Sequence, residues 1–154
     1  MAFTKDLTTT DGYAVPVDGV VGKEFQMNRR VDFSVAANQL AQNEIVALFK
    51  VPAGVLVEEV IPYVETPDTD VTDVDIGGFT TAGVAIVADG FIDGGTLAAA
   101  GAVRDFAGET YSRQDGTAGF CSTSNWIIGL TNKDADTLNG AVVNFVAICK
   151  DLRA

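Results

Sequence analysis

Acidic side chains are the one residue type in this chain that gathers densely enough to suggest chemistry. Nine carboxylates lie between Val51 and Val103, a stretch without Lys or Arg. Two carboxylates that flank a glycosidic bond can act as the acid and the nucleophile of a glycosidase. A sugar cleft would also need aromatic platforms, but aromatic residues make up 8% of the chain and Trp126 is its single tryptophan. We therefore do not expect hydrolase activity. The carboxylates concerned are Glu58, Glu59, Glu65, Asp68, Asp70, Asp73, Asp75, Asp89 and Asp93.

Calcium binding is the alternative chemistry for this acidic stretch. Asp70, Asp73 and Asp75 could supply the hard oxygen ligands that calcium prefers. However, neither residues 68–78 nor residues 89–94 match the twelve-residue calcium loop that lies between two helices. We favour a solvated acidic rim that keeps the surface soluble, and we expect no bound metal and no cofactor.

Histidine is absent from the sequence, which excludes nucleophile–histidine catalysis and histidine metal sites. The run Asp93-Gly94-Gly95-Thr96 lacks the Gly-Lys-Ser/Thr ending of a phosphate loop. Cys121 and Cys149 fit no zinc spacing. They could pair if their strands are neighbours, but we favour free thiols, because Cys149 lies in an apolar run and nothing in the sequence indicates an oxidising compartment. We expect no catalytic residues.

The charge balance limits the possible partners. The formal net charge is -11, so phosphate backbones and anionic lipids would repel the surface. Arg29-Arg30 is the one adjacent basic pair, and we favour a solvated strand edge or a salt-bridge donor for it. No apolar stretch approaches the roughly 18 residues that span a bilayer, and no secretory signal is visible at the start. We expect binding to neither nucleic acid nor membrane.

The elements that would position these residues are strands. Residues 31–35 alternate apolar and polar side chains, as a half-buried strand does. Residues 45–51 and 55–64 are two apolar runs that we predict to pair across the turn Pro52-Ala53-Gly54. Further strands are predicted at residues 71–76, 84–87, 126–130 and 141–149, with a helical turn near 36–43 and at most a couple of helical turns in 96–103. Seven to eight short strands indicate an all-β, jelly-roll-like sandwich.

Residues 1–24 differ from the remainder, because neither a helical nor a strand period persists there. We divide the chain into an extended N-terminal arm, residues 1–24, and a β-sandwich domain, residues 25–154. The arm carries the isolated apolar residues Phe3, Leu7, Tyr13 and Val15. It could be ordered by contact with another molecule or could be a frayed terminus.

The closing strand has two nearly apolar faces. Val143 and Phe145 lie on one face, and Val142 and Val146 lie on the other. A strand on the outside of a lone sandwich should be polar on one face. The second face is therefore covered by a neighbouring subunit or by a long loop over a central strand.

Four segments carry a resemblance to a known family. They are Lys50–Gly54, Asp75–Gly78, Asp89–Gly95 and Val142–Ile148. Their order resembles that of small structural proteins of tailed bacteriophages, the head decoration (cement) proteins, over about residues 45–150. This resemblance implies a jelly-roll-like subunit that assembles as a trimer or a dimer on the outer surface of the capsid, with no catalytic residues.

We therefore expect a virion protein, made in the host cytoplasm, that binds the major capsid protein and stabilises the head by bridging neighbouring capsid subunits. We expect a homo-oligomer, with a trimer favoured over a dimer. The alternative is a receptor- or carbohydrate-binding module of a head fibre or tail accessory protein, using the loops at residues 89–95 and 111–115. The residues that we expect in a subunit or capsid interface are Phe3, Leu7, Tyr13, Val15, Arg29, Arg30, Val143 and Phe145.

Overall fold

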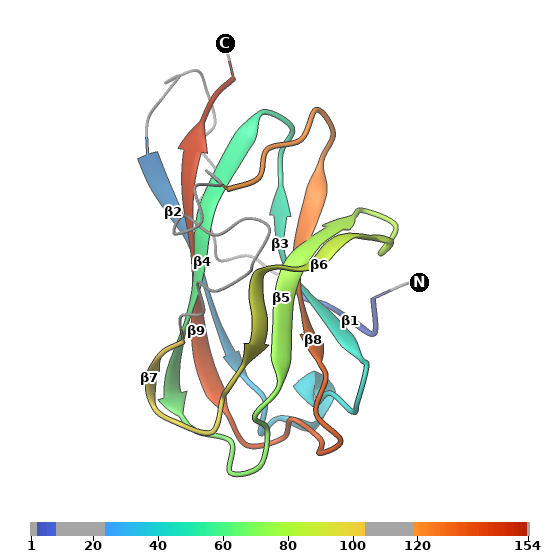
Figure 1. Cartoon of the computed structure of the whole chain (residues 1–154), viewed down its shortest axis with the longest axis vertical. Coiled ribbons are helices and arrows are strands. Elements are labelled where there is room, and N and C mark those ends of the chain that lie inside the picture. The colour runs from blue at the N-terminus through green and yellow to red at the C-terminus, as the bar shows by residue number, and fades with distance from the viewer. Residues whose placement is uncertain (1–2, 9–23, 104–118, 154) are drawn as a thin grey trace.

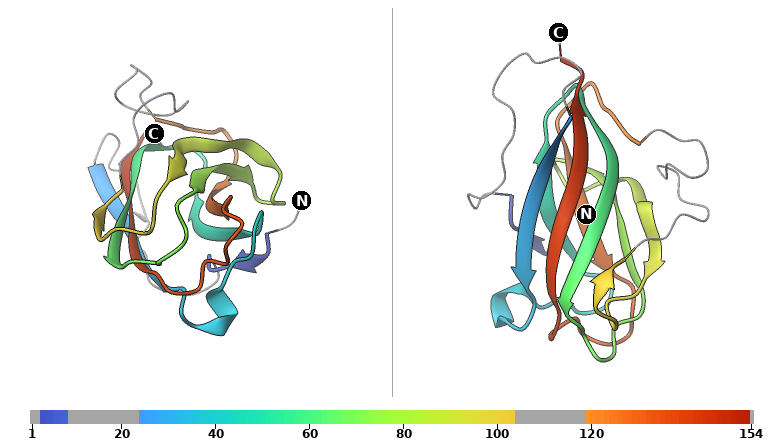
Figure 2. Two further views of the ribbon diagram at one scale, coloured as in Figure 1. Left: turned by 60° about the horizontal axis from the view of Figure 1, so that its bottom comes forward. Right: turned by 90° about the vertical axis from the view of Figure 1, so that its left-hand side faces the viewer.

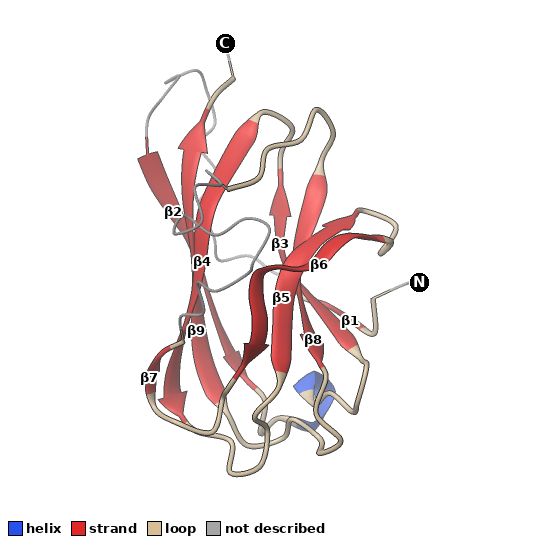
Figure 3. Cartoon of the chain, in the orientation of Figure 1, coloured by secondary structure: helices blue, strands red, loops and turns tan. Residues whose placement is uncertain are grey.

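The structure, a computed structural model, describes residues 3–8, 24–103 and 119–153. These residues form two packed β-sheets (Figures 1 and 3). The elements are β1 (Lys5–Asp6), β2 (Glu24–Asp32), the 3-10 turn η1 (Ala36–Asn38), β3 (Ile45–Val51), β4 (Val55–Thr66), β5 (Val74–Thr80), β6 (Ala85–Gly95), β7 (Gly101–Ala102), β8 (Trp126–Asn132) and β9 (Val142–Asp151).

The pairing of the strands confirms the predicted sandwich and gives it the jelly-roll topology. One sheet has the order β1-β3-β8-β5-β6, and the other has the order β2-β9-β4-β7. The antiparallel pairs β2–β9, β3–β8, β4–β7 and β5–β6 nest inside one another, as in one long hairpin rolled into a double sheet. β1 stands outside this pattern, because it adds to the edge of β3 in parallel.

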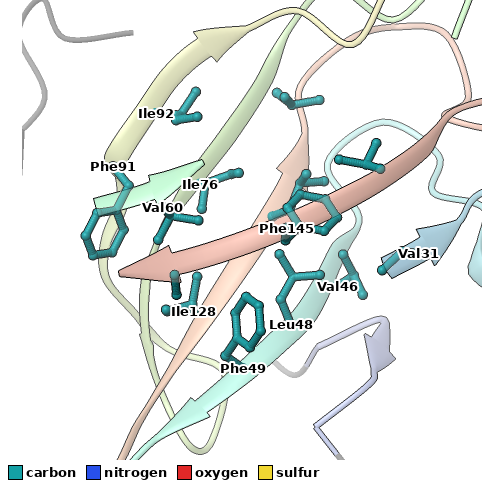
Figure 4. Close-up of a cluster of buried hydrophobic side chains, with 14 of the residues drawn as sticks. Val31, Val46, Leu48, Phe49, Val60, Ile76, Phe91, Ile92, Ile128 and Phe145 are labelled. Carbon is teal, nitrogen blue, oxygen red and sulfur yellow. The ribbon is translucent and has the colours of Figure 1, made fainter. Parts of the chain in front are cut away.

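The core lies between the two sheets, and the alternation of side chains along each strand fills it. Val46 and Leu48 of β3 face Phe145 of β9, and all three are essentially inaccessible to solvent (Figure 4). Phe33 packs edge-to-face on Phe145, with ring centroids 6.4 Å apart. Burying a side chain of this size stabilises the fold by about 1.5–3 kcal/mol. The core therefore explains the apolar runs without a second molecule.

The predicted pairing of residues 45–51 with residues 55–64 is wrong. These runs form β3 and β4, which belong to different sheets. The turn between them therefore crosses from one sheet to the other. Hydrogen bonds to the segment before β8 hold this turn in place. The Ala53 N–H donates to Asn125 Oδ1 at 3.0 Å, and the Gly54 N–H donates to Ser122 O at 2.9 Å. Two apolar runs and a tight turn are typical of a hairpin and of a sheet-to-sheet crossover alike.

Other element boundaries moved. The strand predicted at 31–35 is the end of β2, which closes at Asp32, where Ser34 turns back onto the Asp32 carboxylate. β5 begins three residues later than the strand predicted from residue 71, and β6 extends well beyond residue 87. Residues 96–103 form no helix; the chain bends at residues 98–100 and then enters β7. The helical turn predicted near 36–43 is present as η1.

The closing strand β9 is central in its sheet, between β2 and β4. Val143, Phe145 and Ala147 face the core and are fully buried. The expectation that Val143 and Phe145 belong to an interface with another molecule does not fit this placement, because neither side chain reaches the surface. On the opposite face, Val146 is 8% exposed and belongs to neither buried cluster.

Candidate functional site

Acidic side chains do not converge into a chemical site within residues 3–8, 24–103 and 119–153. No group of three or more His, Cys, Asp or Glu residues there could hold a metal ion. Within the same residues, no helix combines the length and the apolar character needed to cross a bilayer. Surfaces, and the segments that shape them, are therefore the remaining candidates for a functional site among these residues.

Asp68 departs from the solvated acidic rim predicted by its sequence context. Its side chain is only 2% exposed. Its two carboxylate oxygens accept four backbone hydrogen bonds, from the N–H groups of Asn139 (3.0 Å), Gly140 (2.8 Å), Asp70 (3.2 Å) and Val71 (3.4 Å). Burial opposes ionisation, but these N–H donors outweigh it and lower the pKa of Asp68. This carboxylate joins two loops at one end of the sandwich and has a structural role.

Asn132 closes the same end. It is fully buried, and its amide Nδ2 donates to the carbonyl oxygens of Leu40 (2.9 Å) and Asp136 (2.8 Å). Leu40 also forms a β-bridge with Leu138. The end formed by the η1, β4–β5 and β8–β9 connections is thus held by buried polar groups whose bonds are satisfied. Such an end suits a fixed support better than a binding loop.

Among the residues that the structure describes, Asp75 is the acidic side chain whose pKa is raised. Desolvation by burial is the main cause, and the negative charges of Asp93 and Asp73 add to it. One of its carboxylate oxygens accepts a hydrogen bond from the Gly94 N–H at 3.0 Å. The positive charge of Lys133 acts in the opposite direction but does not outweigh these effects.

The first described residues of the arm lie against the body of the same chain. The Thr4 N–H donates to Ile45 O at 2.9 Å, and the Leu7 N–H donates to Ala47 O at 3.0 Å. The Phe3 ring packs edge-to-face on Phe79, with centroids 5.6 Å apart. This part of the arm thus extends the β1-β3-β8-β5-β6 sheet, whereas Tyr13 and Val15 lie outside the described residues.

A second apolar cluster covers the outer face of that sheet. We call it the outer cluster; it comprises Ile45, Ala47, Phe79 and Ile127, with Phe3 and Ala88 packed against it. Gly129 of β8 makes room for it, since a Cβ there would lie 2.8 Å from Phe79 Cε2. The outer cluster makes this face of the sheet apolar, a feature that was not predicted from the sequence.

Residues 77–88 form the tip of the β5–β6 hairpin, which we call the finger. It projects away from the β2-β9-β4-β7 sheet, on the same side as the N-terminus (Figures 1 and 2). A Cβ on Gly77 would collide with backbone atoms of Val87 and Ala88, so the two strands cross more closely there than any other residue type permits. The residue pairing shifts around this crossing, which bends the hairpin tip out of the sheet.

Arg29 and Arg30 do not form a joint basic patch, because neighbouring residues of a strand point to opposite faces. Arg29 shares the inward face of β2 with Met27 and Val31, which are buried. Arg30 lies on the outer face, and its Nε is 2.9 Å from Glu65 Oε2 in an exposed ion pair. The salt-bridge interpretation of Arg30 is therefore confirmed.

Both cysteines are free thiols, as predicted. Cys121 is exposed, whereas Cys149 is buried in the core. Burial, with a smaller contribution from the charge of Glu58, raises the pKa of Cys149 to about 12. Cys149 therefore has no reactive role, because the thiolate is the reactive form.

Sequence reasoning missed Asp68, the outer cluster and the finger. Asp68 looked like one more member of an acidic loop. The signal for the finger was present, since residues 77–88 carry no charged side chain in a chain where 20% of residues are charged. Residues 111–115, named for the alternative binding function, lie outside the described residues.

Comparison with known proteins gives matches in structure alone. No protein-family model matches the chain, and no curated protein matches its sequence. A chain of the structure "Capsid of Ralstonia phage GP4" is similar with a TM-score of 0.63 at 13% identity, over 96% of this chain and 95% of that chain. A chain of "Cyanophage Pam1 capsid asymmetric unit" is similar with a TM-score of 0.53 at 14% identity, over 93% of this chain and 98% of that chain. At such identities the likeness establishes a common fold.

Proposed function

We propose that this chain is a non-enzymatic structural protein of a phage head. It binds the outer surface of the capsid as a decoration (cement) protein and bridges neighbouring subunits of the major capsid protein. One observation carries the proposal: the sandwich matches chains from two phage capsid structures over nearly the whole length of both partners. A neighbour matched along its full length supports a function of the whole subunit rather than of a shared module.

Charge supports a position outside the shell. The chain has a formal net charge of -11, so packaged DNA would repel a subunit that lined the interior. The stretch from Val51 to Val103, which contains no basic residue, supplies β5, β6 and the finger. An acidic exterior also keeps assembled particles dispersed.

Stabilisation by a decoration protein requires area rather than chemistry. Interfaces that persist bury well over roughly 1,000 Å². A subunit that contacts two capsid subunits at their joint adds such area across the joint, which opposes separation under internal pressure. Self-association, with a trimer favoured over a dimer, would place several such contacts in one particle and raise their combined affinity.

The two arginines contribute little to this proposal. Arg30 is engaged with Glu65 on the outer face of the β2-β9-β4-β7 sheet, and Arg29 points toward the core side of β2. The interface is therefore better sought on the side that carries β1, the outer cluster and the finger. Phe3 belongs to that side, where it packs on the outer cluster, whereas Leu7 packs against the core cluster between the two sheets.

Sedimentation with capsids tests the proposed function. Heads prepared without this chain would be mixed with the purified protein, centrifuged and then heated. We expect the protein to pellet with heads in a saturable ratio and to raise the temperature at which DNA is released. Failure to pellet with heads, combined with binding to glycans on an array, would replace the proposal with the carbohydrate-binding alternative.

A further inference from the structure

We propose that the finger, residues 77–88, is a plug that inserts into an apolar depression on the major capsid protein. This inference rests on the proposed function and deepens it, because it names the segment that makes the contact. It also states the chemistry of the partner: a neutral, apolar depression within a lattice of identical subunits.

The first reason to assign a docking role to the finger is that two of its apolar side chains are exposed to solvent. Val84 is 53% exposed and Ile86 is 39% exposed. They are two of the five large exposed apolar residues among the described residues; the other three lie elsewhere, just before η1 (Val35), in β4 (Tyr63) and just after β9 (Leu152). Their spacing of two along extended chain places them on one side of the hairpin. Two large apolar side chains exposed together at a projecting tip form a small apolar patch that docking would bury.

The second reason is that hydrogen bonds fix the conformation of the finger's turn. The turn of the finger is closed by three hydrogen bonds that all involve Thr80. The Thr80 N–H donates to Val84 O at 2.8 Å, the Gly83 N–H donates to Thr80 O at 2.9 Å, and the Val84 N–H donates to Thr80 Oγ1 at 3.1 Å. Gly83 has a φ of 83°, which glycine adopts without strain. A preformed tip loses little conformational entropy when it docks.

The third reason is that the ends of the finger pack on the outer cluster of the sheet. Phe79, at the base of the finger, is buried in the outer cluster and packs on Phe3. Ala88, at the other base, packs on the same cluster. These contacts hold the base of the finger against the sheet. β1 lies on the same side of the molecule (Figure 2).

The absence of charge on the finger and its small exposed area together indicate which kind of partner it binds. The finger has no charged side chain, so its docking would leave no charge buried and unpaired. Two exposed side chains offer far less than the roughly 800 Å² per partner that a stable pair needs, so two copies could not be held together by their fingers alone. A capsid lattice instead presents many equivalent depressions, and an oligomeric subunit can engage several at once.

Substitution to threonine tests the plug. In the double variant Val84→Thr, Ile86→Thr, each residue keeps its β-branched shape but becomes polar. The matched control is Val35→Thr, Leu152→Thr, which changes two similarly exposed residues, 49% and 44%, away from the finger. Binding to heads prepared without this chain would be measured by sedimentation, and thermal unfolding would verify that all variants fold.

We expect the finger variant to bind heads about tenfold or more weakly than the control variant, with the same unfolding temperature. Equal binding by both variants would overturn the inference while leaving the proposed function intact. If the wild-type protein itself failed to bind heads, the proposed function would fail first. Loss of self-association in the finger variant, measured by analytical ultracentrifugation, would also overturn the inference, because it would assign the finger to contacts between copies.

Discussion

Replacing Asp68 with asparagine should destabilise the fold by about 2 kcal/mol. The substitution keeps the size of the side chain but turns one acceptor oxygen into an NH₂ donor. The remaining oxygen can still accept the two shorter bonds, from Asn139 and Gly140 at 3.0 and 2.8 Å. The N–H groups of Asp70 and Val71 then face a donor. A buried donor without an acceptor costs about 1–3 kcal/mol, and the total stays near 2 kcal/mol because both bonds are long, at 3.2 and 3.4 Å, and the Asp70 N–H is only partly buried.

Urea unfolding followed by the fluorescence of Trp126 measures this effect. Trp126 is the single tryptophan, is 1% exposed and stacks on Phe91, so its emission should shift when the core opens. For a chain of this length, 2 kcal/mol corresponds to a fall of about 4–8 °C in the thermal midpoint. The matched control is Asp70→Asn, whose exposed side chain should change stability by less than about 0.5 kcal/mol. Indistinguishable midpoints for the two variants would refute the structural role of Asp68.

The effect of the Asp68→Asn change should depend on pH in a defined direction. The backbone donors lower the pKa of Asp68 in the folded chain below its ordinary value of 3.8. A carboxyl whose pKa is lowered on folding stabilises the protein above the unfolded pKa and loses this contribution as pH falls through the folded pKa. The difference between wild type and variant should therefore be full at neutral pH and should shrink below about pH 4. A difference that grew on acidification would contradict the assignment.

Three further predictions concern other parts of the molecule. Gly77→Ala should destabilise the fold by about 1–3 kcal/mol, because the added methyl group collides with the β6 backbone at the crossing; an unchanged urea midpoint would show that the crossing is looser than the structure indicates. Ellman's reagent at pH 8 should react with one thiol, Cys121, in the native protein and with two after unfolding, because Cys149 is buried and its pKa is raised to about 12; rapid reaction of both native thiols would argue against that burial. Arg30→Ala should lower the thermal midpoint by no more than about 4 °C, since the exposed pair with Glu65 contributes at most about 1 kcal/mol, and a larger fall would indicate a role beyond this pair.

Strand periodicity was sufficient to predict the fold class, because alternation and turn residues are local signals. The strong strands at residues 45–51, 126–130 and 141–149 were located to within a few residues. Their partners could not be predicted, since pairing in a jelly roll joins segments far apart in the sequence. β2 and β9, for example, pair Glu24 with Lys150. The turn at residues 52–54 therefore suggested a hairpin where the chain crosses between sheets.

The surface was harder to predict than the core. An apolar residue in a strand can be buried in its own chain or against another molecule, and Phe145 proved to be a core residue. Conversely, Phe79 and Ile127 alternate with inner-face neighbours, yet they are buried on the outer face beneath Phe3. The sequence cannot distinguish these cases, because the covering segment comes from elsewhere in the chain. The one local signal was the uncharged stretch of residues 77–88.

A cryo-electron microscopy reconstruction of the phage head with and without this chain would test the central claim most directly. We expect difference density of the size and shape of this two-sheet sandwich on the outside of the shell, at joints between capsid subunits, with the finger directed at the shell. Difference density inside the shell or on the tail, or identical maps from the two preparations, would contradict the proposal of an external decoration protein.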